Sequence, residues 1–438
     1  MIRNTRDLER ERRKLTRRQF GCTIIRAAGA SLAAGSVAYA ADPDFTLAVI
    51  PDTQYLAYQC PTAFTNMMTW VVNNRAADQG GVFTTDVKAV IGVGDCSHNN
   101  SAGEFTNGQT AYSRLDRAGI PWVNPPGNHD YGNGADRAQI GSGYRDPSGY
   151  FGSARRQALG AYGILPGGGG ASEWGDAYDN ANYYIRLNVG SRSLLIFSIE
   201  HIPRQVVLEW AKGVADAHPD HEAIVTTHSF LTDTNEFGTF SEEPGNHVYT
   251  NDNRGQGLVT NQGASDARFN SGYAVWNSYL KYWSNLSLVV CGHWIYQAWH
   301  TSKEGASNSW FLQQRAIRSS GPRGHAVQAI FANWQEVDAG TYSALPGGGG
   351  NRGPGVYCSA FPANAAGARI AHVMLLHFRP SSGKLDGYAL STNTGLWEPT
   401  QANRAMAPTS SPQLLFSLDH TGAPPKLMRQ FPIERRKK

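Results

Sequence analysis

Short apolar runs alternate with longer amphipathic segments in the first third of this 438-residue chain. Apolar runs at 45–50, 87–93 and 121–124 are separated by amphipathic segments at 61–77 and 109–118. Apolar runs of this length are typical of buried strands, whereas the amphipathic segments have the length and period of helices. The order strand, helix, strand, helix, strand predicts a layered α/β domain.

The second half of the chain continues this alternation and adds two hairpins. Residues 183–199 and 370–392 each have the pattern of two strands joined by a tight turn. The other expected elements are helices at 203–218 and 270–283 and strands at 222–227, 286–290 and 326–332. Between them, 131–180 is rich in Gly, Asp, Ser and Tyr, and 229–268 is similarly loop-like. We expect both segments to be loop insertions in the α/β domain.

The first 40 residues have the layout of an export signal. Thr-Arg-Arg-Gln-Phe at 16–20 is a twin-arginine pattern, a weakly apolar stretch follows over 21–39, and Ala38 and Ala40 are the small residues that a signal peptidase reads. We therefore expect transport by the twin-arginine export machinery, cleavage near Ala40, and a periplasmic or secreted protein. The alternative is a basic amphipathic arm that binds nucleic acid or a membrane.

The export signal also accounts for the positive net charge of the chain. Residues 1–40 carry 9 of the 39 basic and 3 of the 35 acidic residues, which leaves 30 basic and 32 acidic residues beyond them. A net charge of −2 gives no reason to expect nucleic acid as a partner. Beyond residue 40 no apolar run approaches the ~18 residues of a membrane span, so we expect no stable span.

The expected organisation is a signal peptide at 1–40, one domain at 41–400 and a C-terminal tail at 401–438. Four cysteines lie beyond the signal, without a CxxC pair or the spacing of a zinc site: Cys60, Cys96, Cys291 and Cys358. Export permits disulfides. Cys96 and Cys291 border apolar runs, so we expect small buried residues there and leave a disulfide as the alternative.

Polar side chains follow five of the expected strands, at the point where each strand ends. They are Asp52 and Gln54 after the first strand, Asp95 after the second, Asn128, His129 and Asp130 after the third, and His228 and His293 after two later strands. Loops at the carboxyl ends of the strands converge at one edge of an α/β sheet, where ligand sites gather. Carboxylate, amide and imidazole groups are metal ligands. The pattern therefore predicts a metal centre at that edge.

These motifs resemble those of the calcineurin-like metallophosphoesterase superfamily, which run D-x-H, G-D, G-N-H-D/E, a strand-end His and G-H-x-H. Here they are Asp-Thr-Gln at 52–54, Gly-Asp at 94–95, Gly-Asn-His-Asp at 127–130, His228 and Gly-His-Trp-Ile at 292–295. The resemblance covers about residues 45–392 and is strongest to exported members that open with Pro-Asp-Thr-Gln. It implies a four-layer α/β/β/α sandwich with loop insertions that binds two divalent metal ions.

The ligands that the resemblance implies are Asp95 as a bridge, Asn128, His228 and His293 in the second site, and Asp52 and Gln54 in the first. Two first-site ligands depart from the family, because Gln54 and Ile295 stand where it has histidine. The first site is left with oxygen donors and the second keeps two imidazoles. Ligand softness then predicts Mn, Zn or Fe in the second site and a weakly held Mn, Mg or Ca in the first.

A nearby histidine is a candidate replacement ligand for the first metal. His98 lies three residues after Asp95, the offset at which the related purple acid phosphatases place a ligand tyrosine. The alternative is a loop histidine that faces solvent or substrate. The other histidines lack motif support, and we expect structural or surface roles for them: His201, His218, His221 and His300.

The resemblance implies hydrolysis of a phosphate-ester small molecule, with diesters favoured over monoesters. A hydroxide that bridges the metals would attack phosphorus, with His129 as acid or charge stabiliser and Asp130 orienting His129. We expect the two insertions to rim the site, where they could bind a sugar, nucleoside or lipid head group. Two alternatives stay open: a degenerate binding protein without turnover, and a hydrolase of non-phosphate esters.

Overall fold

The structure is a computed structural model. It describes residues 42–130, 150–151, 162–164, 182–231, 237, 270–293, 312–318, 324–334, 370–398 and 409–420. All of them belong to the unit that runs from Ala41 to Lys438. The expected signal peptide, Cys358, Ile295, His300 and most of the two insertions lie outside the described residues. No helix among the described residues is long and apolar enough to cross a membrane.

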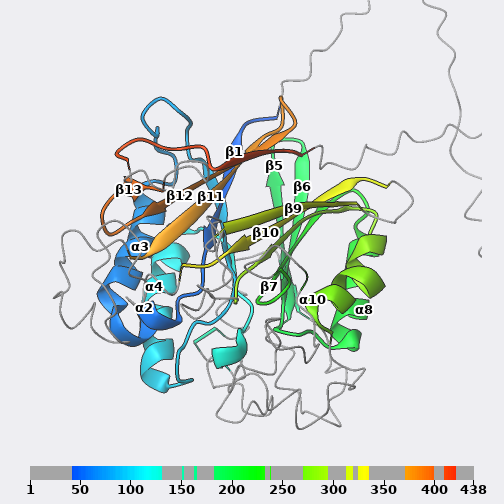
Figure 1. The fold of residues 1–438 in the computed structure, drawn as a ribbon, viewed down its shortest axis with the longest axis horizontal. Helices are drawn as coiled ribbons and strands as arrows, with labels where there is room; N and C mark the ends of the chain where they lie inside the picture. The colour runs from blue at the N-terminus through cyan, green and yellow to red at the C-terminus, as the bar shows by residue number, and fades with distance from the viewer. Residues whose placement is uncertain are drawn as a thin grey trace, which may run out of the picture. The chain divides into compact units, whose positions relative to one another are not determined.

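The first sheet has seven strands in the order β13-β12-β11-β1-β2-β3, and β14 also pairs with β12. Its strands are β1 (Phe45–Ile50), β2 (Val87–Gly92), β3 (Trp122–Val123), β11 (His372–Arg379), β12 (Lys384–Ser391), β13 (Leu396–Trp397) and β14 (Phe416–Asp419). Strands β1, β2 and β3 are parallel, whereas β11 is antiparallel to β1. The loops after β1, β2 and β3 therefore leave the same edge of this sheet (Figure 1).

The second sheet also has seven strands, in the order β4-β5-β6-β7-β8-β10-β9. Its strands are β4 (Tyr162–Ile164), β5 (Tyr183–Val189), β6 (Arg192–Ile199), β7 (Glu222–Thr227), β8 (Leu286–Cys291), β9 (Leu312–Arg318) and β10 (Ala326–Ala332). The central strands β6, β7, β8 and β10 are parallel. This sheet therefore also has one edge at which the carboxyl ends of its strands meet.

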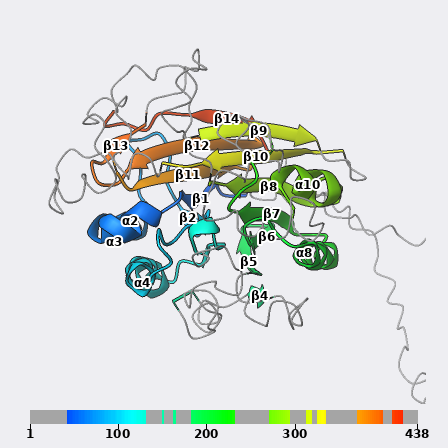
Figure 2. The same ribbon diagram turned by 60° about the horizontal axis from the view of Figure 1, so that its bottom comes forward.

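The two sheets pack face to face, and helices cover their outer faces. Apolar side chains of both sheets form the layer between them, among them Leu47, Ile91, Ile224, Val290 and Leu376. The first sheet is covered by α2 (Gln54–Gln59), α3 (Pro61–Asn73) and α4 (Ala102–Ala118). The second is covered by α8 (Gln205–Ala217) and by the turns α10 (Gly272–Ala274), η4 (Val275–Tyr279) and η5 (Leu280–Tyr282). This layering, visible in Figure 2, confirms the expected α/β/β/α sandwich.

Helix α4 begins at a capping box that also fixes a loop of the candidate site. The Ser101 side chain accepts from the backbone N–H of Glu104, and the Glu104 carboxylate accepts from that of Ser101. The same carboxylate accepts from the backbone N–H groups of His98 and Asn99, at 3.1 and 2.8 Å. The helix ends at Gly119, which has the left-handed conformation that favours glycine (φ 64°). The start of α4 thereby holds the loop that follows β2.

The sheets extend into segments that the sequence analysis assigned to loops or to the tail. Strand β4 lies inside the 131–180 insertion, and β14 lies beyond residue 400, the expected end of the domain. Strand β14 pairs with β12, and the ring of Phe416 covers Gly387, where an added Cβ would lie 2.2 Å from a ring carbon. Because Gly387 has no side chain, the Phe416 ring can pack against it and β14 can pair with β12. The four-residue sequence of β14 alone does not predict a strand.

The cysteines divide into two kinds. Cys96 and Cys291 are free and buried, as expected. Cys60 is disulfide-bonded, a state that the sequence left open. Cys60 directly precedes helix α3, where it is 5% exposed.

Candidate metal centre

The candidate site lies where loops from the carboxyl ends of both sheets meet. Backbone hydrogen bonds join these loops, from Thr53 N to Asp95 O at 3.2 Å and from Gly292 N to His228 O at 2.9 Å. Asp95 and His293 both have positive φ, 50° and 73°. Non-glycine residues rarely adopt this conformation, and such strain gathers at functional sites. The loops therefore hold these two side chains at a cost in backbone free energy.

Four side chains bring nitrogen and oxygen atoms together at the expected second metal site. His228 Nε2 lies 2.9 Å from Asn128 Oδ1 and 3.3 Å from Asp95 Oδ2. His293 Nδ1 lies 2.9 Å from the same Asn128 oxygen and 3.1 Å from His228 Nε2. His228, Asn128 and Asp95 are at most 1% exposed, whereas His293 is partly exposed. The four side chains therefore form a largely buried cluster, in which the imidazole of His293 is the partly exposed member.

A backbone carbonyl fixes which nitrogen of His228 faces this cluster. His228 Nδ1 lies 2.8 Å from the carbonyl oxygen of Val93, which can only accept a hydrogen bond, so Nδ1 carries a proton. In the neutral ring Nε2 then has a free lone pair, the state required of a metal ligand. With both imidazoles neutral, His293 Nδ1 can supply one proton to the Asn128 oxygen and His228 Nε2 that it contacts. A cation among them satisfies the remaining lone pairs, so the residues present fit a metal ion.

The charges around the cluster favour a cation as well. Burial alone would raise the pKa of Asp95, but His228, His129 and His293 outweigh burial and hold it below the ordinary value. Burial lowers the pKa of His228, yet the Asp95 carboxylate reverses this and raises it overall. Burial and the nearby Asp95 raise the pKa of Asp52 well above its ordinary value. Asp52, Asp95 and His228 each contribute one possible ligand atom, and these three atoms lie within 4.8 Å of one another. Two buried carboxylates therefore lie close together beside the His228 ring.

The expected first site is built from Asp52, Gln54 and the loop after β2. Gln54 is buried, and its backbone N–H donates to Asp52 Oδ1 at 3.3 Å. Its side-chain Oε1 lies 2.9 Å from Nδ1 of His98. His98 therefore reaches Gln54, the residue at which the resemblance to the metallophosphoesterases led us to expect histidine. Whether His98 also binds a metal stays a prediction.

His129 is held by the side-chain carboxylate of Asp95 and by the main chain of His98. Its N–H donates to Asp95 Oδ1 at 2.9 Å, and its Nδ1 lies 2.8 Å from the carbonyl oxygen of His98. Nδ1 therefore carries a proton. The resemblance gave the task of orienting His129 to Asp130. In the structure the main chain of His98 holds the ring.

Asp130 instead ties two loops of the site together. Its carboxylate accepts from the backbone N–H groups of Cys96, Ser97 and Gly127, and from the Ser97 hydroxyl, at 2.9 to 3.1 Å. Burial and the nearby Asp95 raise its pKa to about 7, although these hydrogen bonds oppose the rise. Asp130 thus positions the loops that carry Asp95 and Asn128.

Two glycines allow the loops to approach this closely. A Cβ on Gly127 would lie 2.1 Å from Asp95 Oδ1, far inside contact distance. A Cβ on Gly94, which has φ 102°, would lie 2.7 Å from His228 Nδ1. Any side chain at either position would displace an expected metal ligand.

His201 belongs to the site although no motif pointed to it. Its ring is fully buried, and its centroid lies 5.3 Å from that of His228 and 5.1 Å from that of His293. It follows the end of β6 by two residues, at the same carboxyl edge as the other site residues. That position after a strand was the available signal. His218 and His221 precede β7 and bond to Val214 O and Asp220 Oδ1, in line with the expected structural roles.

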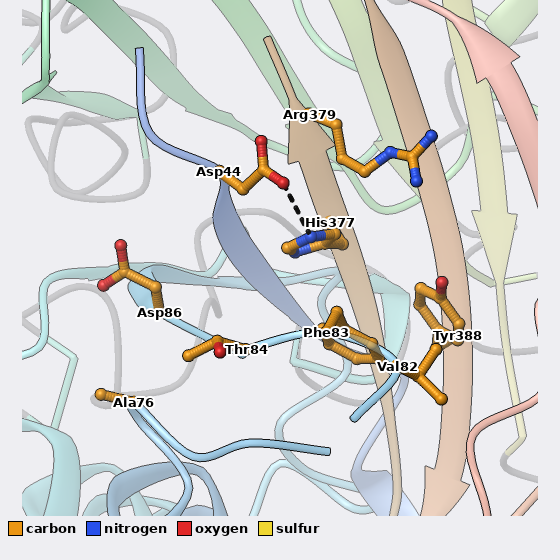
Figure 3. Close-up of a pocket in the computed structure, with 9 residues that line it drawn as sticks. All are labelled: Asp44, Ala76, Val82, Phe83, Thr84, Asp86, His377, Arg379 and Tyr388. Carbon is orange, nitrogen blue, oxygen red and sulfur yellow. Dashed lines mark ion pairs between the residues drawn. The ribbon is translucent and has the colours of Figure 1, made fainter. Parts of the chain in front are cut away.

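A separate cavity of about 410 Å³ lies at the opposite edge of the first sheet (Figure 3). Asp44, before β1, and His377, on β11, lie side by side in its lining, with 3.8 Å between the carboxylate oxygen and Nε2. The Phe83 ring stacks on that of Tyr388 at 4.4 Å. The site residues follow the carboxyl end of β1 and Asp44 precedes its amino end, so this cavity is not part of the candidate metal centre.

Comparisons with known proteins add a distant likeness. No protein family model matches the chain. The uncharacterized protein YvnB of Bacillus subtilis (strain 168) is 26% identical over 188 residues. This match covers 43% of the present chain and 13% of YvnB, so the chain spans a small part of that relative's length. The name of this relative carries no activity, and function has to be inferred from the site.

Proposed function

We propose that this chain is an exported, metal-dependent hydrolase of phosphate esters, similar to the calcineurin-like metallophosphoesterases. The observation that carries the proposal is the cluster of Asp95, Asn128, His228 and His293, in which Val93 sets His228 in the tautomer of a metal ligand. Together with Asp52, these side chains offer two carboxylates, one amide and two imidazoles at the edge where the two sheets meet, which matches the ligand chemistry of such hydrolases. The twin-arginine pattern supports export.

The donor atoms would divide between two metal ions that prefer different ligand atoms. His228, His293 and Asn128 would hold Mn, Zn or Fe, while Asp52 and Gln54 would hold Mn, Mg or Ca more weakly, with Asp95 shared. Bound divalent ions supply charge neutralisation at the phosphoryl group and a water of lowered pKa. The protein's part is to fix the ligands, which Asp130, Gly94 and Gly127 do by joining the loops.

His129 is suited to the proton transfer that ester cleavage needs. The attacking water loses one proton to solvent as its oxygen forms the new P–O bond, the ester P–O bond breaks, and the leaving oxygen takes a proton from the doubly protonated ring of His129. The carbonyl of His98 holds the Nδ1 proton in place, and the carboxylate of Asp95 holds the backbone N–H. The first contact fixes the orientation of the ring, and the second fixes the main chain that carries it.

One observation favours the second candidate, a binding protein of this fold without turnover. The side-chain oxygen of Gln54 is already within hydrogen-bond distance of His98, in a site that lacks the family histidine. A first site that holds no ion would leave the metal centre incomplete.

A single set of assays separates the two candidates. The chain without residues 1–40 is purified, its metals are measured, and bis- and mono-(p-nitrophenyl) phosphate are offered with Mn, Zn, Fe, Mg or Ca, with and without chelator. Chelator-sensitive turnover, faster with the diester, is the expected result. Bound metal without turnover under any of these conditions would establish the binding protein instead.

A further inference from the structure

The cavity at the amino end of β1 combines apolar and polar groups in its lining. Its volume of about 410 Å³ is that of a small-molecule site. Ala76, Val82 and Phe83 form the apolar part, and Val82 is 51% exposed. The Phe83 ring lies 4.8 Å from that of His377, which in turn lies beside Asp44 (Figure 3). The cavity therefore offers a carboxylate and an imidazole next to apolar surface.

One ring nitrogen of His377 has no hydrogen bond to any residue that the structure describes. Its Nδ1 lies 3.1 Å from the Thr46 hydroxyl, whereas its Nε2 lies 3.8 Å from Asp44 Oδ2, which is too long for a hydrogen bond. His377 is only 2% exposed, so water has little access to this nitrogen. A polar atom buried to this extent gains stability from a hydrogen-bond partner, and a ligand in the cavity can supply one.

The charged groups around the cavity leave one carboxylate without a cation. Arg379 Nε pairs with the buried Asp386 at 3.2 Å, and Lys88 Nζ pairs with Asp86 at 2.7 Å. The side chain of Asp44 is 46% exposed, and no lysine or arginine among the described residues pairs with it. One negative charge at the cavity is therefore open to a ligand of opposite charge.

His377 does not neutralise this charge at pH 7. Burial lowers the pKa of its imidazole below the ordinary 6.5, although nearby carboxylates, that of Asp44 first among them, act against the fall. The ring is therefore neutral at pH 7, and its Nε2 can accept a hydrogen bond when Nδ1 donates to the Thr46 hydroxyl. A carboxylate and a neutral imidazole 3.8 Å apart then present two acceptors to one donor group.

We propose that this cavity binds a small organic cation that carries a primary ammonium group and an apolar body. The ammonium lies between Asp44 and His377 and donates to the carboxylate and to Nε2, while the apolar body contacts Val82 and Phe83. A primary ammonium has three N–H donors and one positive charge, so it satisfies both acceptors and neutralises Asp44. The cavity and the metal centre lie at opposite edges of the first sheet, so this inference does not depend on the proposed function.

The experiment compares three ligands that share one apolar ring: benzylammonium, benzyl alcohol and benzyltrimethylammonium. Calorimetric titration into the purified protein, with chelator present, should show benzylammonium binding at least about tenfold more tightly than the alcohol, which lacks the charge, or the quaternary ion, which lacks the N–H donors. In Asp44→Asn the Kd of benzylammonium should rise about tenfold, and that of benzyl alcohol less than about twofold. Asp220→Asn is the matched control, since the side chain of Asp220 is 75% exposed and lies outside the cavity.

A second measurement locates the bound cation. The NMR signals of the His377 ring, identified by their loss in His377→Gln, should shift as benzylammonium is added to the histidine-labelled protein. Absence of binding to the wild type, equal affinity for benzylammonium and benzyl alcohol, or an unchanged Kd in Asp44→Asn would overturn the proposal. Binding that leaves the His377 signals in place would assign the cation to another site and overturn it as well. None of these outcomes bears on hydrolysis, which the assays at the metal centre test separately.

Discussion

The Nδ1 proton of His228 is held by the carbonyl oxygen of Val93 at 2.8 Å, and this contact turns the other ring nitrogen toward Asn128. Val93 follows β2 of the first sheet and His228 follows β7 of the second, so the contact spans the two sheets. The packing of the two sheets therefore sets the tautomer and the ring orientation of His228. A preset tautomer and ring orientation raise the affinity of a histidine for a metal.

His228→Ala is expected to lower the metal affinity of the second site at least about 100-fold, because it removes a direct ligand whose orientation is preset. Turnover should fall with metal content. The measurement is metal analysis after dialysis against graded concentrations of Mn or Zn, with His221→Ala as a control outside the site. A variant that keeps its metal and its turnover would contradict the ligand set proposed here.

Gly127→Ala is expected to displace Asp95, since the new Cβ would lie 2.1 Å from its Oδ1 and 2.4 Å from its backbone N. Overpacking of this kind costs about 2 kcal/mol of the free energy of unfolding, and metal binding should weaken as well. Gly213→Ala is the matched control. A Cβ there meets no atom within 4 Å in helix α8, so stability should rise by up to about 1 kcal/mol. Urea unfolding of both variants measures the difference, and equal stabilities would refute the steric account.

A buried charge network links the C-terminal strand to the second sheet and should make stability depend on pH. Glu222 bonds to Arg192, to His420 Nε2 at 2.6 Å and to the Ser287 hydroxyl at 2.7 Å. Burial raises the pKa of Glu222, but His420 and Arg192 outweigh it and hold the pKa at about 2, below the ordinary 4.5. The pKa is lower in the folded protein, so this stabilisation is present above about pH 4.5 and is lost as pH falls toward 2.

Between pH 5 and pH 3 the Glu222 carboxylate alone is expected to cost the protein about 2 kcal/mol of stability. Glu222→Gln should show a shallower loss over that range and lower stability at pH 7, where it breaks a buried ion pair. Urea unfolding at several pH values measures both slopes, with the exposed Glu209→Gln as control. If Glu222→Gln loses stability as steeply as the wild type, the network is not the source of the pH dependence.

Much of the fold could be predicted from apolar runs with clear ends. Strands β1, β7 and β10 begin and end where the apolar patterns do, because each run is buried along its whole length or nearly so. The expected helix at 270–283 is helical but divides into α, π and 3-10 turns. Strand β9 was missed because Leu-Gln-Gln-Arg-Ala-Ile-Arg is an edge strand that carries polar residues and so lacks a continuous apolar run.

The candidate site was predictable as a set of residues but not as a set of contacts. Asp95, Asn128, His228 and His293 follow strand ends, and parallel strands bring such ends together. The hydrogen-bond partners of Asp130 depend on how the loops of the site pack against one another, and the spacing of residues in the sequence does not show this. His201 lies after β6, a position that the sequence does show, but without a motif, and its contacts with His228 and His293 become clear from the packing of the sheets.

His98 is the residue for which the structure sharpens the sequence hypothesis most. Its side chain contacts Gln54, while its carbonyl oxygen holds the ring of His129. In His98→Ala the carbonyl remains, so the orientation of His129 should persist and only the side chain is tested. If His98 is a ligand of the first metal, the variant should lose the weaker-bound ion, keep the second, and lose turnover in proportion.

Metal content at graded Mn concentrations, measured together with kcat, separates this role from a purely structural one. Added Mn should restore part of the activity of His98→Ala, because a weakened site can be filled by mass action. His98→Gln, which offers an oxygen donor, should need less Mn than the alanine variant. Unchanged metal content and turnover in His98→Ala would refute the ligand hypothesis, and the first site would then depend on Asp52, Gln54, Asp95 and water alone.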